Sequence, residues 1–443
     1  MRKKRFGKKI LIAGLVGLAM FFGANKCVLA QEDVAAHEDV VAHEGEVGGP
    51  NLDDIIEGVN VSGFVTSAYQ YNLAEDGSRD DGIGGNSGRD SLGFPNFLEF
   101  RDDNSINLEA LEVQIVKEAT AEHPVGFAFV TDYGEIARNL TFGGRFPNGD
   151  HDNNDEDRFA LQAGYVEWLM PVGKGIDFKI GKFATWIGSE VIEDVDNPNL
   201  THSQNYNNSI PFTHSGLSLG YDLRDNVRTT FYLVNGWDSF TDNNDAKTFG
   251  WQVAWTAKSD RLSMVFNGIH GAEKADNNDD MTHLFDWVGT FKLNDKLSFL
   301  ANFDYGWTEE ARIDSIDVDT SDPVLADTDG DRIPDVITIG DGVADSGNGI
   351  KDSGADAHWA GGALTAIYQI RDWMNTAIRY EYSDYTDEFG FSVWEVTAGL
   401  NMKVSNNLLI RPEYRHNQYN DDGVGGSGQR GDDILAIGFS YIF

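Results

Sequence analysis

LQAGYVEWLMPVGKGIDFKIGKFATWIG, residues 161–188, contains two partly alternating apolar segments joined by a short turn at Gly173-Lys174-Gly175. A polar stretch, Ser189–Ser215, follows, and then GLSLGYDL (216–223) turns within three residues into VRTTFYLVNGW (227–237). The rest of the chain repeats this order of short turn, long loop and short turn. Such an order is typical of a closed antiparallel β-barrel in an outer membrane, with short turns on one rim and long loops on the other.

The composition limits the classes of partner and fold. The chain has 443 residues, a formal net charge of −38, 12% aromatic residues and 49 glycines but only 10 prolines. This acidity excludes nucleic acid as a partner, because phosphate binding requires clustered Lys and Arg. Many glycines and aromatic residues, with few long apolar runs, favour many short strands over helices.

The first 58 residues precede the strand pattern. A basic start, an apolar run over Ile10–Phe22 and a small residue at Ala30 predict a signal peptide over residues 1–30, with an N-terminal membrane anchor as the alternative. The only cysteine, Cys27, lies within it. Residues 31–58 form an acidic segment with two histidines, which we interpret as a periplasmic tether in preference to a metal site.

The region 59–443 predicts an all-β, transmembrane antiparallel barrel of about sixteen strands, with short periplasmic turns and long extracellular loops. In Val59–Asn72, for example, Val61 and Tyr69 alternate with Ser62 and Gln70, so that one face meets an apolar medium and the other meets water. A sheet in lipid must close, because an open edge would leave backbone groups unpaired. The expected strands are 59–72, 106–119, 125–134, 161–172, 176–188, 216–223, 227–237, 248–258, 261–271, 283–293, 296–308, 358–370, 373–385, 393–404, 407–419 and 433–443.

The last expected strand alternates up to the final residue. Leu435, Ile437, Phe439 and Tyr441 share one face with Phe443, which ends the chain. A terminal aromatic residue on such a strand resembles the signal read by the machinery that inserts barrels into the outer membrane. The alternative is an ordinary edge strand of a soluble β-sandwich.

Four short motifs carry a family resemblance. They are PVGKG (171–175), GKF (181–183), PFTHSG (211–216) and NGWD (235–238). Together they resemble the OmpL-like putative beta-barrel porin family, called porin-2. The resemblance implies an outer-membrane porin, and it identifies a family without identifying a solute.

The polar stretch 189–215 is the candidate constriction loop. In general porins, which this layout resembles, one long loop folds inward and narrows the channel. The stretch carries Glu190, Glu193, Asp194 and Asp196. Acids lining a low-dielectric pore would concentrate cations and repel anions. The alternative is an ordinary extracellular loop.

Charged side chains at alternating strand positions are expected to face the pore. They share strands with apolar residues of the opposite face, and Arg or Lys facing lipid costs about 2–4 kcal/mol near mid-bilayer. A basic wall opposite the acidic loop would create a transverse field. The alternative is structural ion pairing in a plugged lumen. These wall residues are Arg228, Arg379, Glu381, Arg411, Glu413 and Arg415.

A calcium-like motif lies in the long acidic loop 309–357. Asp327, Asp329, Asp331 and Asp335 occupy offsets 1, 3, 5 and 9 of DTDGDRIPD, the oxygen spacing of a calcium loop. The motif resembles thrombospondin type 3 repeats more than an EF-hand, because Thr338 stands where an EF-hand requires Glu. Calcium is thus a possible ligand, no cofactor is required, and a merely solvated loop is the alternative.

The sequence favours a passive channel for small hydrophilic solutes and ions that prefers cations. It would lie in the outer membrane of a Gram-negative bacterium, in contact with lipid and lipopolysaccharide, as a homotrimer by analogy. The alternative is a non-conducting barrel that serves as an adhesin or stabilises the envelope with calcium. The adjacent His214 and Ser215 do not indicate an enzyme, because neighbours on a strand point to opposite faces.

Overall fold

The structure is a computed structural model that describes residues 57–73, 104–141, 158–275, 277–309, 313–316, 350–352, 356–389, 391–421 and 429–443. The expected signal peptide and nearly all of the segment 31–58 lie outside the described residues. The four aspartates of the calcium-like motif also lie outside them. Those three interpretations therefore stay predictions.

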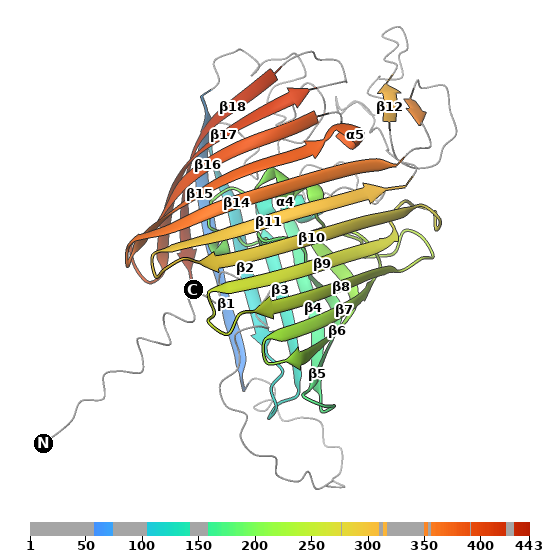
Figure 1. Ribbon diagram of the computed structural model, residues 1–443. Coiled ribbons are helices and arrows are strands. Elements are labelled where there is room, and N and C mark those ends of the chain that lie inside the picture. Colours follow the sequence, from blue (N-terminus) through green and yellow to red (C-terminus); the bar gives the residue numbers. More distant parts are fainter. Residues whose placement is uncertain are drawn as a thin grey trace, which may run out of the picture.

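Sixteen antiparallel strands form a closed barrel, which confirms the predicted fold (Figure 1). Strands that are neighbours in the sequence pair with each other, and β14 follows β11 in the wall. The strands are β1 (Val59–Asn72), β2 (Ser105–Lys117), β3 (Val125–Tyr133), β4 (Phe159–Met170), β5 (Ile176–Ala184), β6 (Thr213–Arg224), β7 (Val227–Val234), β8 (Thr248–Thr256), β9 (Leu262–Ala272), β10 (Met281–Lys292), β11 (Leu297–Thr308), β14 (Ala357–Arg371), β15 (Met374–Tyr385), β16 (Phe391–Lys403), β17 (Leu408–Asp421) and β18 (Gln429–Ile442).

The barrel closes between its first and last strands. Strand β1 pairs with β18 from Phe64 opposite Ile442 to Asn72 opposite Ile434. Beyond this ladder, Gly63 N–H donates to the carbonyl of Phe443 at 3.0 Å, and Phe443 N–H donates back at 2.9 Å. The C-terminal residue is therefore part of the seam. Closure removes the unpaired edge that a sheet would otherwise expose to lipid.

Alternating residues give the barrel an apolar outer surface. Large apolar side chains are exposed on every side of the wall, among them Phe129, Trp168, Phe231, Phe303, Leu364, Tyr380 and Phe439. Their strand neighbours, such as Asp304 and Arg379, are buried inside. The outer surface thus suits a hydrocarbon medium. No helix in the described part of the chain is both long and apolar enough to span a membrane.

The short helices and the small second sheet are features that the sequence patterns did not predict. The helices are α3 (Glu135–Thr141), the 3-10 turn η3 (Asp194–Asp196), α4 (Gln204–Ser209) and α5 (Thr386–Phe389). Within the expected loop 309–357, β12 (Ile313–Ile316) pairs with β13 (Ile350–Asp352). The helices have between three and seven residues, too few for an apolar stripe with a helical period to stand out.

The expected strand 176–188 is too long, because β5 ends at Ala184. Trp186 and Ile187 continue the apolar pattern but are buried inside the barrel instead of facing lipid. The strand expected to end at Trp237 likewise stops at Val234. The candidate loop consequently spans residues 185–212 instead of 189–215, and we call this segment the inner loop.

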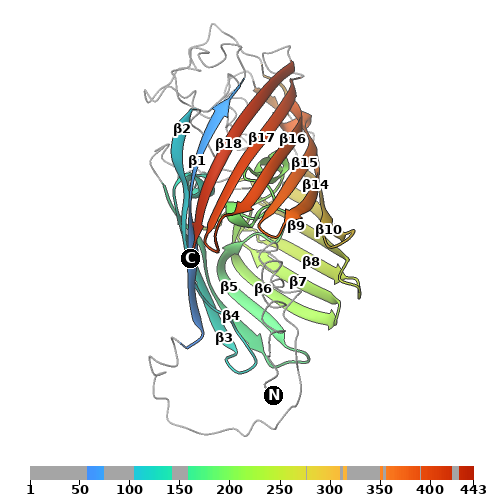
Figure 2. The same ribbon diagram turned by 90° about the vertical axis from the view of Figure 1, so that its left-hand side faces the viewer.

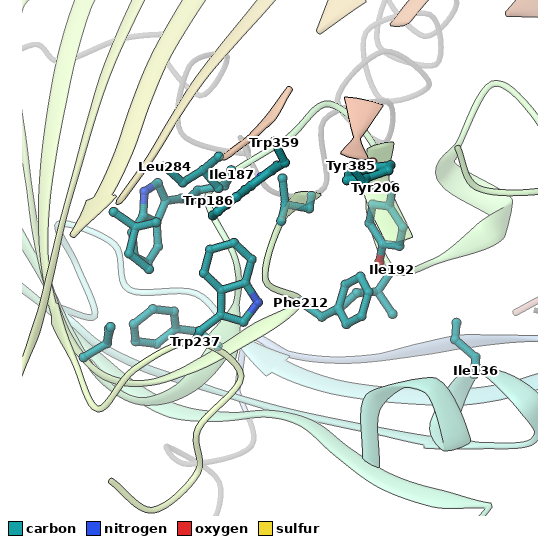
Figure 3. Packing of buried hydrophobic residues seen from close by; sticks show 14 of the residues in the cluster. Ile136, Trp186, Ile187, Ile192, Tyr206, Phe212, Trp237, Leu284, Trp359 and Tyr385 are labelled. Carbon is teal, nitrogen blue, oxygen red and sulfur yellow. The ribbon is translucent and has the colours of Figure 1, made fainter. Parts of the chain in front are cut away.

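The inner loop lies within the barrel, where it builds the largest hydrophobic core. Its residues pack with inward-facing residues of the wall, including Leu284, Trp359 and Tyr385 (Figure 3). Helix α4 of the loop packs against β11, β14 and β15 and is seen within the barrel in both views (Figures 1 and 2). The barrel therefore encloses a folded segment instead of an empty lumen.

The outer surface yields a direct test of the membrane orientation. Leu364 is 50% exposed at the middle of β14, whereas Leu293 is 47% exposed beside the short turn after β10. We expect Leu364→Arg to reduce the free energy of unfolding by about 2–4 kcal/mol and Leu293→Arg by about 0–1 kcal/mol. Urea unfolding in lipid vesicles, followed by tryptophan fluorescence, measures both. Equal losses would contradict a hydrocarbon layer at the depth of Leu364.

Candidate functional site

The two ends of the inner loop are fixed together where β5 ends and β6 begins. Thr185 N–H donates to the carbonyl of Phe212 at 2.9 Å. The buried ring of His214 joins both sides, with Nε2 3.1 Å from Thr185 Oγ1 and Nδ1 3.0 Å from the carbonyl oxygen of Gly236. Asp238 accepts the N–H groups of Phe212 and Thr213 at 2.6 and 2.9 Å. His214 therefore has a structural role, in agreement with the non-enzymatic interpretation.

Burial raises the pKa of Asp238 to about 6, although its two backbone hydrogen bonds act in the opposite direction. Its carboxylate is thus mostly ionised near neutral pH. Hydrogen bonds to an ionised acceptor are stronger than those between neutral groups. Asp238 is therefore a firm anchor for the point where the inner loop rejoins the wall.

Aromatic side chains hold the first part of the inner loop. The indole of Trp186 stacks on the ring of Tyr232, with ring centroids 3.7 Å apart and planes 7° apart. Gly250 of β8 makes this approach possible, because a Cβ atom there would lie 2.0 Å from Trp186 Cζ2. On the other side of the loop, Trp359 Nε1 donates to the carbonyl of Ser209 at 3.2 Å. Apolar packing thus places the loop before any charge is considered.

Two buried glutamates of the wall accept the backbone N–H groups of the inner loop. Glu413 of β17 accepts Leu200 N–H at 2.7 Å and Thr201 N–H at 3.0 Å, and it also accepts the hydroxyl of Thr201 at 2.6 Å. Glu381 of β15 accepts the N–H groups of Gln204 and Asn205 at 3.0 and 2.5 Å. These two N–H groups open helix α4, where the free amides and the helix dipole favour a negative charge.

Three buried arginines of the same wall donate to loop carbonyls. Arg411 donates to the carbonyls of Asp194 and Asn197, the latter at 2.8 Å. Arg415 Nη1 lies 2.6 Å from the carbonyl oxygen of His202, and Arg379 Nη1 lies 2.9 Å from that of Thr201. Alternating Arg and Glu side chains on the wall therefore satisfy both the donors and the acceptors of one irregular backbone.

A third glutamate joins the arginines into one network. Glu395 of β16 is fully buried, and it forms ion pairs of 2.7 Å with both Arg379 and Arg415. Arg379 also pairs with Glu190 of the inner loop at 2.6 Å. Glu190 in turn accepts the N–H and the hydroxyl of Ser203. Each charge is compensated, as a charge buried in a protein requires.

The structure brings most of the predicted site residues together but gives them different surroundings. Glu190 and Asp194 are buried, and Asp194 accepts from Thr66 of β1 at 3.3 Å. Glu193 is half-buried and accepts from Gln162 of β4 at 2.8 Å, and Asp196 is also half-buried. The inner loop thus reaches from the arginine-bearing strands across to β1 and β4.

Arg228 lies apart from the other predicted wall residues. It is close to the short turn after β6, where it pairs with Asp177 at 2.8 Å and Asp222 at 3.2 Å. Sequence alternation correctly gave it a position on the inner face. The pattern gave no position along the barrel axis, because depth depends on the stagger of the strands.

Sequence analysis missed four residues of this region. Glu395 joins the arginines, Thr201 bonds to Glu413, and Glu112 of β2 and Asp132 of β3 are buried on the opposite wall. Alternation contains the signal for the three acids, because Glu112 and Glu395 lie between apolar residues of the outer face and Asp132 precedes the outward Tyr133. Thr201 gives no such signal, since it lies in an irregular segment.

In the ranges that the structure describes, no group of three or more His, Cys, Asp or Glu side chains is arranged to hold a metal ion. The arrangement resembles neither a catalytic constellation nor a cofactor cradle. It is a wall that fixes a loop across the interior of a barrel. Its geometry can shape and charge a passage.

Comparisons with known proteins agree with the barrel fold. The outer membrane channel DcaP of Acinetobacter baumannii is similar in structure, with a TM-score of 0.52 and 12% identity over 87% of this chain and 97% of that one. A loop L8 deletion mutant of OmpT, an outer membrane protein of Vibrio cholerae, gives 0.50 and 10% over 87% and 99%. At such identities the likeness shows the fold alone. The search of curated proteins found no match.

The family comparison covers the barrel from its first strand to its last. The sequence profile of the family described as "Putative beta-barrel porin-2, OmpL-like" matches residues 58–443. This range includes the four motifs that carried the resemblance, and also the whole wall and the inner loop. The chain therefore belongs to the putative beta-barrel porin-2, OmpL-like family, and it is a non-enzymatic outer-membrane barrel of the porin type.

Proposed function

We propose that the barrel conducts small hydrophilic solutes and ions by passive diffusion and that it prefers cations. The observation that carries this proposal is an excess of acidic side chains beside the inner loop. Glu193 and Asp196 are half-buried on the loop, and Glu112 and Asp132 are buried on the wall that faces Glu193. Acids in a low-dielectric passage raise the local concentration of cations.

The arginines do not offset this excess. Arg379 and Arg415 are committed to Glu395, and Arg379 also pairs with Glu190. Arg411 donates to backbone carbonyls, and its positive charge attracts the carboxylate of Asp194. Their charges therefore compensate buried partners on one side of the loop. The acids on the other side set the sign of the field in the passage.

A second candidate function is a barrel that does not conduct. The large apolar core around the inner loop, including Trp186, Tyr206 and Phe212, favours it because these side chains occupy the interior. Such a barrel would act as an adhesin or as a calcium-dependent stabiliser of the envelope. Single-channel recording in a planar bilayer distinguishes the two functions: stepwise currents support the channel, and a correctly folded but silent barrel supports the alternative.

Assembly and insertion complete the proposal. We propose a homotrimer in contact with outer-membrane lipid and lipopolysaccharide, inserted through recognition of the last strand with its terminal Phe443. The position of Phe443 at the barrel seam supports this order of events, because β18 must be correctly placed before β1 can close on it. Cross-linking of the folded protein in lipid tests the trimer.

Cation preference leads to the first functional prediction. Replacing both Glu193→Gln and Asp196→Asn removes two half-buried acids while the arginine network stays intact. Under a salt gradient, we expect the reversal potential to move toward zero. Asp225→Asn is the control, since this acid is exposed in the short turn between β6 and β7 and pairs only with Lys174 in the described structure. An unchanged reversal potential in the double variant would refute the role of these two acids.

Loop anchoring leads to the second functional prediction. In the Glu413→Gln variant, two backbone N–H groups of the loop face a neutral amide instead of a carboxylate. We expect this change to lower the free energy of unfolding by roughly 1.5–3 kcal/mol. We expect noisier and more variable single-channel currents, because the loop loses a fixed point. Glu167→Gln is the matched control: Glu167 accepts the N–H of Ala119 at 2.6 Å but does not touch the loop. Equally noisy currents in both variants would contradict the prediction, because the noise would then not come from the loss of the loop's anchor.

A further inference from the structure

The wall opposite the arginines contains buried carboxylates without basic partners. Glu112 and Asp132 face each other directly across β2 and β3, and they are 0% and 1% exposed. Like charges in directly opposed positions destabilise a sheet. Neither residue forms an ion pair within the described structure, although the charge of Lys182 acts on Asp132. Either a shared proton or a bound cation must therefore compensate this pair.

The carboxylate oxygens are also short of hydrogen bonds. Glu112 accepts from Gln114 through Oε1 at 2.5 Å, but its Oε2 is buried without a hydrogen-bond partner. Both oxygens of Asp132 are likewise buried, and Glu112 itself is the only side chain that interacts with them by hydrogen bonding among the described residues. Burying an acceptor without a partner costs free energy, and burying a charged one costs more. The two side chains thus present free oxygens to the same small region.

A neutral side chain independently supplies another free oxygen at this place. Gln162 of β4 is a bulge residue: Val130 pairs with Ala163 and Thr131 pairs with Leu161, so Gln162 has no partner on β3. Bulges redirect side chains, and this one directs an amide into the interior. Its Nε2 donates to Glu193 at 2.8 Å, whereas its Oε1 is buried and unbonded.

Glu193 brings the inner loop to the same place. The two atoms of an amide are about 2.2 Å apart, so Gln162 Oε1 lies close to the Glu193 carboxylate. The charge of Glu193 acts on both Glu112 and Asp132. The neighbouring Ile192 packs in one cluster with Ile136, which follows β3 in helix α3 (Figure 3). This hydrophobic cluster therefore keeps the loop's acid near the two acids of the wall.

We infer that Glu112, Asp132 and the amide oxygen of Gln162 bind a divalent cation of the calcium class, which joins the inner loop to the wall through the adjacent Glu193. Oxygen ligands suit hard cations. Calcium fits better than magnesium because it tolerates irregular geometry, whereas magnesium demands a near-ideal octahedron, and these ligands come from three strands. Water molecules complete the coordination sphere.

A second buried pair of acids shows the contrast. Asp286 and Asp304 also share the interior, but amides surround them. Asn267 donates to Asp286 at 2.5 Å, and Asn302 donates to Asp286 at 2.7 Å and to Asp304 at 2.9 Å. The structure therefore supplies donors to that pair and supplies almost none to Glu112 and Asp132. The difference points to a cation beside Glu112 and Asp132 and not beside Asp286 and Asp304, where amides suffice.

The proposed site does not depend on whether the barrel conducts, and its test uses binding alone. Full-length protein, folded in detergent and stripped with EDTA, is titrated with calcium chloride in a calorimeter. The tested protein contains the substitutions Asp327→Asn, Asp329→Asn, Asp331→Asn and Asp335→Asn, so that no heat arises from the calcium-like motif. We expect one calcium ion per chain, with a dissociation constant of about 10⁻⁴ to 10⁻³ M.

Two variants and one control locate the site. Asp132→Asn and Glu112→Gln should each abolish the heat of binding, whereas Asp304→Asn, in the amide-rich pair, should retain it. The proposal would be overturned if the protein with Glu112, Asp132 and Asp304 unchanged gave no heat at millimolar calcium. Full binding by the Asp132→Asn variant would also overturn it. In the first case a shared proton, instead of a metal ion, would hold the carboxylates together.

Thermal unfolding supplies a readout that a purely structural role would not move. In EDTA, Asp132→Asn should unfold at a higher temperature than the parent, because the variant removes repulsion between like charges. In millimolar calcium the order should reverse, because only the parent gains a bound ion. An order that stays the same in EDTA and in calcium would contradict the proposal.

Discussion

The inner loop depends on one constraint: the backbone groups that it buries inside the barrel must find partners there. Strands satisfy each other, but an irregular segment cannot, and an unpaired buried group is costly. Strands β15 and β17 meet this need with alternating charges of both signs. Glu381 and Glu413 accept the loop's N–H groups, while Arg379, Arg411 and Arg415 donate to its carbonyls. The wall thus replaces the water that an exterior loop would use.

These charges are tolerable only because they also compensate one another. A lone buried arginine would destabilise the barrel, yet Glu395 lies between two of them and the loop's own Glu190 completes the network. Packing of Trp186 and Trp359 fixes the position of the loop inside the barrel, and the charged side chains fix the conformation of its backbone. Packing and charge therefore restrict different degrees of freedom of the same segment.

Much of the barrel follows from the sequence because two solvents impose a simple alternation. The strand count, the antiparallel order and the inward direction of Arg379, Arg411 and Arg415 were all predictable from it. The rule fails where an apolar residue faces neither lipid nor water. Trp186 continues the pattern of β5 but packs against Tyr232 inside the barrel, and nothing local in the sequence distinguishes the two environments.

The partners within the site were less predictable for a different reason. Arg379 meets Glu190 across a separation of 189 residues, and Glu413 meets Leu200 across 213. Such contacts depend on strand stagger and on the path of an irregular loop, and one sequence specifies neither in a readable way. Alternation can state that a charge points inward, but it cannot name the group that receives it.

Different interactions hold the two edges of the inner loop. On the side of β15–β17, opposite charges and backbone groups are matched, so the loop is stable there whatever ions surround the barrel. On the side of β2–β4, Glu193 meets Glu112 and Asp132, and among the described residues only Gln162 donates a hydrogen bond to its carboxylate. Coulomb repulsion between carboxylates in a low-dielectric interior is far larger than in water. The position of this second edge must therefore depend on what compensates the acids, whereas the first edge supplies its own compensation.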